Sequence, residues 1–208
     1  MNNKTNRFGP ILLTLIPVAL MWVVIFAWQP VNFWLLMTLA QCGMITMALA
    51  LRYRQITAKK ITLTEAAIGL GSAVLLYVIF VVANEISVFL FDFARNDIQN
   101  IYAIRDQAQA RWIALLLLFI IGPGEEIYWR GLIQDTLVER LGPLKGVLIA
   151  SACYALVHVV AWNFMLIGAA AVCGLFWGLL YQWRKNIFTV IVSHAVWDVV
   201  VMVLFPIG

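Results

Sequence analysis

Long runs of apolar residues, separated by short polar segments, dominate the pattern of this chain. Each run is close to the ~20 residues that a helix needs to cross a hydrocarbon core of ~30 Å. Strands of a membrane barrel are shorter and alternate polar with apolar positions, so the runs predict helices. The pattern therefore predicts an all-α, polytopic transmembrane helical bundle of about seven spans: Pro10–Trp28, Val31–Leu51, Ala66–Phe91, Trp112–Gln134, Leu144–Trp162, Phe164–Trp183 and Ile187–Phe205.

The composition supports the same class. Of the 208 residues, 64% are hydrophobic and 12% are charged, whereas soluble domains average roughly 45–50% apolar and about 25% charged residues. The chain has too few polar side chains to cover a globular surface in water, so we expect an integral membrane protein. The net charge of +4 is small and unevenly distributed, so it indicates membrane orientation and no nucleic-acid partner.

Lysine and arginine are concentrated in the alternate segments that share one side of the predicted membrane. With a cytoplasmic N-terminus, eleven of the fourteen lie in inner segments. The positive-inside rule then predicts an N-in, C-out protein of the plasma membrane. The inner residues are Lys4, Arg7, Arg52, Arg54, Lys59, Lys60, Arg130, Arg140, Lys145, Arg184 and Lys185, and the outer ones are Arg95, Arg105 and Arg111.

Two of the polar connecting segments carry local structural signals. Thr62 and Glu65 have the spacing of a capping box directly before the third apolar run, which predicts the start of a helix there. The segment DFARNDIQNIYAIRDQAQAR, between the third and fourth runs, mixes both charges. We expect it to form a helix or loop at the outer face.

Three charged residues interrupt the fourth apolar run, in the stretch GPGEEIYWRG. Glu126 and Arg130 are four residues apart and are expected to pair on one helix face. Glu125 is rotated from Glu126 by ~100° around the helix, so it is left without a local partner. An ionisable residue inside a bilayer costs a few kcal/mol or more, which favours a functional site over an ion pair that merely ends the helix.

The chain has two histidines, and both fall within apolar runs. His194 precedes Asp198 by one helical turn, so the carboxylate can orient the imidazole. At ~1.5 Å per residue, Glu125, His158 and His194 lie about 22, 20 and 14 Å from the basic residues expected at the inner face, which are Arg140, Lys145 and Lys185. We therefore expect one polar cluster, formed by three helices below the inner face and reachable from the cytoplasm.

Three short patterns carry a resemblance to a known family. EEIYWR fits E-E-x-x-x-R, YALVH approaches F-x-x-x-H, and HAVWD fits H-x-x-x-[N/D]. In this order, on separate membrane helices, the set resembles the CPBP family of CAAX proteases and bacteriocin-processing enzymes, also called Abi. The likeness covers about Trp112–Phe205. Tyr154 departs from the usual Phe, and Asp198 stands where the eukaryotic CAAX enzymes have Asn.

The resemblance implies an intramembrane endopeptidase with a CPBP-like catalytic core at residues 112–208, preceded by N-terminal transmembrane helices and loops at 1–111. By that resemblance, Glu125 activates a water that His158 helps to position, His194 and Asp198 stabilise the oxyanion, and Glu126 and Arg130 hold the helix. The chemistry is coherent, because a desolvated carboxylate suits general-base work and imidazoles aimed at developing negative charge stabilise it.

Metal use stays open at the level of sequence. Two histidines and two or three carboxylates are donors that bind zinc or a similar divalent ion and leave a position for water. The chain lacks the HExxH pattern, whose paired histidines would indicate a metalloprotease directly. A water activated by glutamate alone fits the same residues.

The expected partners are a peptide or protein substrate at or in the membrane, and the lipid bilayer itself. One alternative is a non-catalytic immunity or regulatory protein built on the same fold. A second is a proton-coupled transporter, because acids and histidines also form proton relays. The chain is short for a transporter and shows no inverted repeat.

Overall fold

The computed structural model describes residues 8–57 and 60–208, and every regular element within those ranges is helical. Seven stretches are long and apolar enough to cross a membrane, which confirms the predicted all-α bundle. The fourth extends well beyond the predicted Trp112–Gln134. The stretches are Phe8–Trp28, Phe33–Leu51, Leu63–Leu90, Ala110–Leu141, Pro143–Ala161, Phe164–Arg184 and Ile187–Leu204.

Several of these stretches are built from more than one helical segment. The first contains α1 (Phe8–Leu13), α2 (Leu15–Trp22) and η1 (Val23–Trp28); it is followed by α3 (Phe33–Thr57), α4 (Leu63–Leu90), α5 (Ala94–Ala103) and η2 (Ile104–Gln107). The fourth contains α6 (Ala110–Leu116), η3 (Leu117–Ile121), α7 (Gly122–Glu126), η4 (Ile127–Gln134) and α8 (Asp135–Leu141). The rest are α9 (Pro143–Val157), η5 (His158–Ala161), α10 (Phe164–Arg184), α11 (Ile187–Val199) and η6 (Val200–Leu204).

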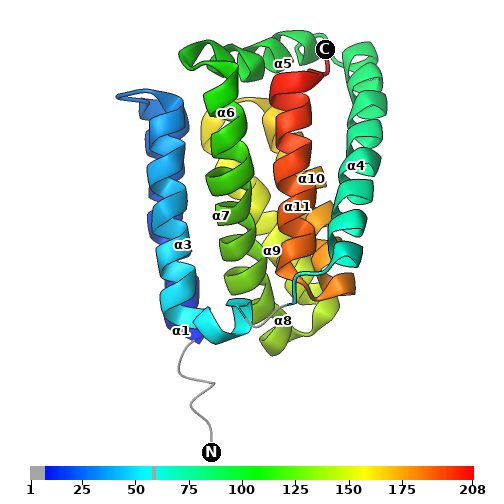
Figure 1. Cartoon of the computed structure of the whole chain (residues 1–208). Coiled ribbons are helices and arrows are strands. Elements are labelled where there is room, and N and C mark those ends of the chain that lie inside the picture. Colours follow the sequence, from blue (N-terminus) through cyan, green and yellow to red (C-terminus); the bar gives the residue numbers. More distant parts are fainter. Residues whose placement is uncertain (1–7, 58–59) are drawn as a thin grey trace, which may run out of the picture.

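Helix α11 lies in the interior of the bundle, packed on α4, on α7 and on α10 (Figure 1). Helix α3 packs along the fourth span, against α7 and η4. Helix α5 lies across one end of the bundle, next to the C-terminus, whereas α8 lies at the opposite end (Figure 1). The polar segment between the third and fourth spans is thus a helix, one of the two forms expected for it.

The start of α4 is capped as its sequence predicts. The Thr62 hydroxyl accepts a hydrogen bond from the backbone N–H of Glu65 at 3.2 Å. The Glu65 carboxylate does not complete the capping box in return. It accepts from Arg184 of α10 at 2.6 Å and from the hydroxyl of Thr189 on α11, so it ties three helices together at this end of the bundle.

Two glycines allow α7 to approach its neighbours closely. A Cβ atom at Gly122 would lie 2.9 Å from Cα of Ala195 on α11, and one at Gly124 would lie 2.9 Å from the side chain of Gln41 on α3. Widened π-helical turns, η3 and η4, flank α7, and such turns are frequent at functional sites. The segment that carries the two glutamates is therefore held between α3 and α11.

The basic residues expected on one side do gather at one end, as far as the structure describes them. Lys60, Arg140, Lys145, Arg184 and Lys185 lie at the ends of helices on the α8 side of the bundle. Lys4, Arg7, Lys59 and the side chains of Arg52 and Arg54 lie outside the described residues. Arg130 is a correction to the inner set, because it is buried within the bundle. Which side of the membrane this end faces remains a prediction.

Candidate active site

The adjacent acids of α7 have different surroundings. Glu126 is fully buried, and its Oε1 atom lies 3.0 Å from Arg130 Nη1 and 2.6 Å from His194 Nδ1. The pairing of Glu126 with Arg130 that the four-residue spacing predicts is present. Arg130 and His194 both donate to this one oxygen, so Glu126 links the fourth span to α11.

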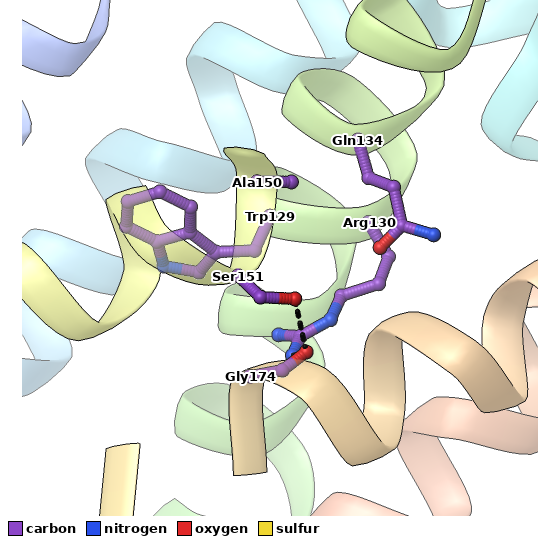
Figure 2. Close-up of a pocket in the computed structure, with 6 residues that line it drawn as sticks. All are labelled: Trp129, Arg130, Gln134, Ala150, Ser151 and Gly174. Atoms are coloured by element: carbon purple, nitrogen blue, oxygen red, sulfur yellow. Dashed lines mark hydrogen bonds between the residues drawn. The ribbon is translucent and has the colours of Figure 1, made fainter. Parts of the chain in front are cut away.

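Arg130 is enclosed between the fourth span and α10. Its Nη2 atom donates to the backbone carbonyls of Cys173 and Gly174, at 3.4 and 3.2 Å. Figure 2 shows the side chain extending toward the Gly174 carbonyl, which also accepts from the Ser151 hydroxyl at 2.9 Å. The gap beside these groups is too small for a water molecule, so the guanidinium serves the packing of three helices.

His194 lies between two carboxylates. Its Nδ1 atom is hydrogen-bonded to Glu126, and its Nε2 atom is 3.4 Å from Asp198 Oδ2, one helical turn further along α11. The ring also stacks on that of Trp177, with centroids 3.7 Å apart. Because carboxylates accept hydrogen bonds, this environment holds both ring nitrogens as N–H donors.

Glu125 has partners that the sequence analysis missed. The Tyr154 hydroxyl donates to its Oε2 atom at 2.7 Å, and the amide of Gln41 donates to Oε1 at 3.5 Å. These partners come from α9 and α3 and not from its own helix, so the local spacing that left Glu125 without a local partner did not reveal them. Two signals pointed to them: Gln41 is an isolated amide in an apolar run, and Tyr154 is one turn before His158.

His158 presents the opposite hydrogen-bonding character to His194. Its Nδ1 atom is 2.8 Å from the backbone carbonyl of Tyr154. A carbonyl accepts only, so Nδ1 carries a proton, and in the neutral form of the ring Nε2 is then a lone-pair acceptor. The ring is buried among aromatic side chains, edge-on to Trp22 and Tyr154, which fixes its orientation.

One cavity of about 650 Å³ is lined both by hydrogen-bond acceptors and by hydrogen-bond donors of the candidate site. Its walls include two groups that accept hydrogen bonds, the carboxylate of Glu125 and the ring of His158. They also include the donor ring of His194, together with Asp198. Most of the remaining lining is apolar or aromatic, so charges in the cavity interact with little screening by water. The lining includes the polar residues Glu125, Tyr154, His158, His194 and Asp198.

The far end of the cavity is lined by the end of α4 and by α5, including Phe91, Phe93 and Tyr102. This is the end of the bundle that Figure 1 shows beneath α5, opposite the basic end at α8. The sequence predicted access from the basic end. Among the described residues, the lining includes none of the basic side chains at the α8 end and extends instead toward α5.

The donor set does not form a metal site in this arrangement. Within residues 8–57 and 60–208, no three His, Cys, Asp or Glu side chains are grouped closely enough to hold an ion. Both nitrogens of His194 face carboxylates, so coordination by this ring requires a contact to break. Glu125 and His158 also line the cavity, but both oxygens of Glu125 already accept hydrogen bonds.

Comparison with known proteins agrees with the motifs in the sequence. The family model described as Type II CAAX prenyl endopeptidase Rce1-like matches residues 107–200. This part of the chain is thus similar to the CPBP family. No curated protein and no solved structure matches the chain. The CPBP segment includes all six residues singled out in the sequence, whereas Gln41 of α3 lies outside it.

Proposed function

We propose that the protein is an intramembrane endopeptidase in which Glu125 activates the attacking water. The observation that carries the proposal is the shared cavity, in which the carboxylate of Glu125 lies with an acceptor histidine, His158, and a donor histidine, His194. A hydrolytic site needs a base on one side of the scissile carbonyl and donors on the other. The family described for residues 107–200 is one of endopeptidases.

The proposed chemistry begins with a water held between Glu125 and the Nε2 atom of His158. Glu125 removes a proton as the water oxygen attacks the peptide carbonyl, and the carbonyl oxygen becomes an oxyanion. His194, anchored at Nδ1 by Glu126, stabilises that charge by turning the N–H of Nε2 from its longer, 3.4 Å contact with Asp198 to the oxyanion. Glu125 then gives its proton to the leaving amine as the peptide C–N bond breaks.

Glu126 and Arg130 act through the other groups. Their ion pair fixes the end of α7 against α10 and fixes the ring of His194. Such preorganisation matters because displacement of a reacting group by ~1 Å can cost ~100-fold in rate. In this proposal neither residue contacts the substrate.

Substrates to test first are peptides with a prenylated C-terminal tail, as the family description implies, together with unprenylated precursor peptides and membrane-protein segments. The purified protein, reconstituted in lipid, should cleave at least one of them, and Glu125→Gln should not. The assay is repeated with a strong chelator. Cleavage that persists in the chelator supports the glutamate mechanism, and chelator-sensitive cleavage restored by zinc contradicts it.

A further inference from the structure

Two side chains to which the sequence motifs assign no catalytic role hold the carboxylate of Glu125 at both oxygens. Oε2 accepts from the hydroxyl of Tyr154 and Oε1 from the amide of Gln41. Tyr154 comes from α9 and Gln41 from α3. The carboxylate is therefore fixed by helices on both sides of the fourth span, although none of its partners carries a charge.

The hydroxyl of Tyr154 has little freedom to move. Its ring lies edge-on to Trp129, with centroids 5.4 Å apart, and the Arg130 guanidinium lies 4.9 Å from its centroid. On the α10 side, a Cβ atom at Gly174 would already be 3.1 Å from the ring. A hydrogen bond from a phenol held in this way sets the direction of the acceptor carboxylate.

Gln41 completes the arrangement from the opposite side. Its side chain is fully buried, and its position is fixed by close contact with Gly124, the residue before Glu125. The distance from its amide nitrogen to Glu125 Oε1 is 3.5 Å, against 2.7 Å for Tyr154 and Oε2. Oε1 is thus the less engaged oxygen and the better proton acceptor of the two.

We propose that Tyr154 is a positioning residue for the general base, with Gln41 as its counterpart. The inference rests on the proposed function of Glu125. The two residues hold the carboxylate so that Oε1 takes the proton from the attacking water. The usual Phe of the family pattern cannot supply the hydroxyl, so this part of the mechanism belongs to chains that carry Tyr at this position.

The central test is the kinetics of Tyr154→Phe, which removes one oxygen and keeps the ring. We expect kcat to fall at least ~10-fold while KM stays within about twofold, because the bond orients the base and not the substrate. Gln41→Leu should lower kcat less. The double variant should lose less than the product of the two single effects, because both residues act on one carboxylate.

Tyr181→Phe is the matched control. Tyr181 is also buried and also donates to a carboxylate, that of Asp135, at 2.8 Å, but neither residue lines the cavity. Its kcat should equal that of the unmodified protein. An unchanged kcat in Tyr154→Phe, or an equal loss in both Tyr variants, overturns the positioning role.

A second measurement does not depend on cleavage. The carboxylate stretching band that is lost in Glu125→Gln identifies Glu125 in difference infrared spectra. Loss of the Tyr154 hydrogen bond should shift this band, and Tyr181→Phe should leave it in place. If Glu125→Gln cleaves normally, the proposed function fails; if Glu125→Gln is inactive but Tyr154→Phe changes neither kcat nor the band, only this inference fails.

Discussion

At the scale of single residues, the site separates two neighbouring acids by the kind of partner that each one has. Glu126 is bonded to an arginine and a histidine, and Glu125 to a phenol and an amide. A carboxylate bound by cations is a structural anchor, because removing its charge leaves buried cations without compensation. Glu125, which has neutral donors as partners, lines the cavity, and this is why we assign it the proposed chemistry.

The first prediction is that Glu125→Gln removes activity without unfolding the protein. Glutamine keeps the shape and can still accept from Tyr154, but it does not take a proton. Cleavage should fall by at least ~100-fold, with the melting temperature in detergent close to that of the unmodified protein. Near-native cleavage in this variant contradicts the assignment of Glu125 as the base.

The second prediction is that Glu126→Gln lowers stability together with activity. The substitution leaves Arg130 buried without its carboxylate, which typically costs about 3–5 kcal/mol. The melting temperature should drop, and activity normalised to folded protein should drop as well because His194 loses its anchor. If the variant melts normally and is inactive while Glu125→Gln cleaves, the two acids have been assigned in the wrong order.

The sequence predicted the contacts that lie within one helix and missed those between helices. Both four-residue spacings, Glu126 with Arg130 and His194 with Asp198, are contacts in the structure. The partners of Glu125 and the bond between Glu126 and His194 join residues 29 to 84 positions apart. Such contacts depend on how the helices pack, and helical periodicity carries no information about that.

At the scale of helical elements, the spacing between helices around α7 depends on Gly122. A side chain at this position would clash with the backbone of α11 at Ala195. The same helix face carries the contact between the fourth span and His194, so the two helices must stay at this distance for the bond to Glu126. We therefore infer that Gly122 is needed for the close packing of α7 on α11, on which the bond between Glu126 and His194 depends.

The third prediction follows from that close approach. Gly122→Ala places a methyl group 2.9 Å from Ala195 Cα, and such overpacking typically costs about 1–3 kcal/mol. Thermal stability and cleavage should both fall. Gly71→Ala is the control, because its methyl group meets nothing within 4 Å and alanine favours a helix by about 1 kcal/mol over glycine. A stable, active Gly122→Ala would show that the spacing is not required.

Hydropathy was sufficient to locate the spans, because lipid requires every crossing segment to satisfy its own backbone. The fourth span shows the limit of that reasoning. It continues through α8 to Leu141, since the polar residues from Asp135 onward extend the helix beyond the apolar run. The π-helical turns on either side of α7 also escaped prediction, because they arise from packing and not from composition.

At the scale of the whole molecule, the charged end and the open end are opposite. The described basic residues lie at the α8 end, whereas the cavity continues from the residues of the candidate site toward α5. The sequence predicted the uneven distribution of basic residues and the polar cluster formed by three helices. It also predicted access from the basic end, whereas the cavity extends toward α5. If the positive-inside rule holds, substrates reach the site from the outer face; if access is cytoplasmic, the charge rule fails in this chain.

The last prediction decides between these orientations. In a variant lacking Cys42, Cys153 and Cys173, a single cysteine replaces either Gln99 on α5 or Lys145 on α9, both of which are exposed. With the orientation given by the charges, a membrane-impermeant thiol reagent added to intact cells labels Gln99→Cys, and labels Lys145→Cys only after the cells are opened. The reverse pattern places α5 and the mouth of the cavity in the cytoplasm. Either result fixes the side of the membrane toward which the cavity extends, since its lining reaches the α5 end.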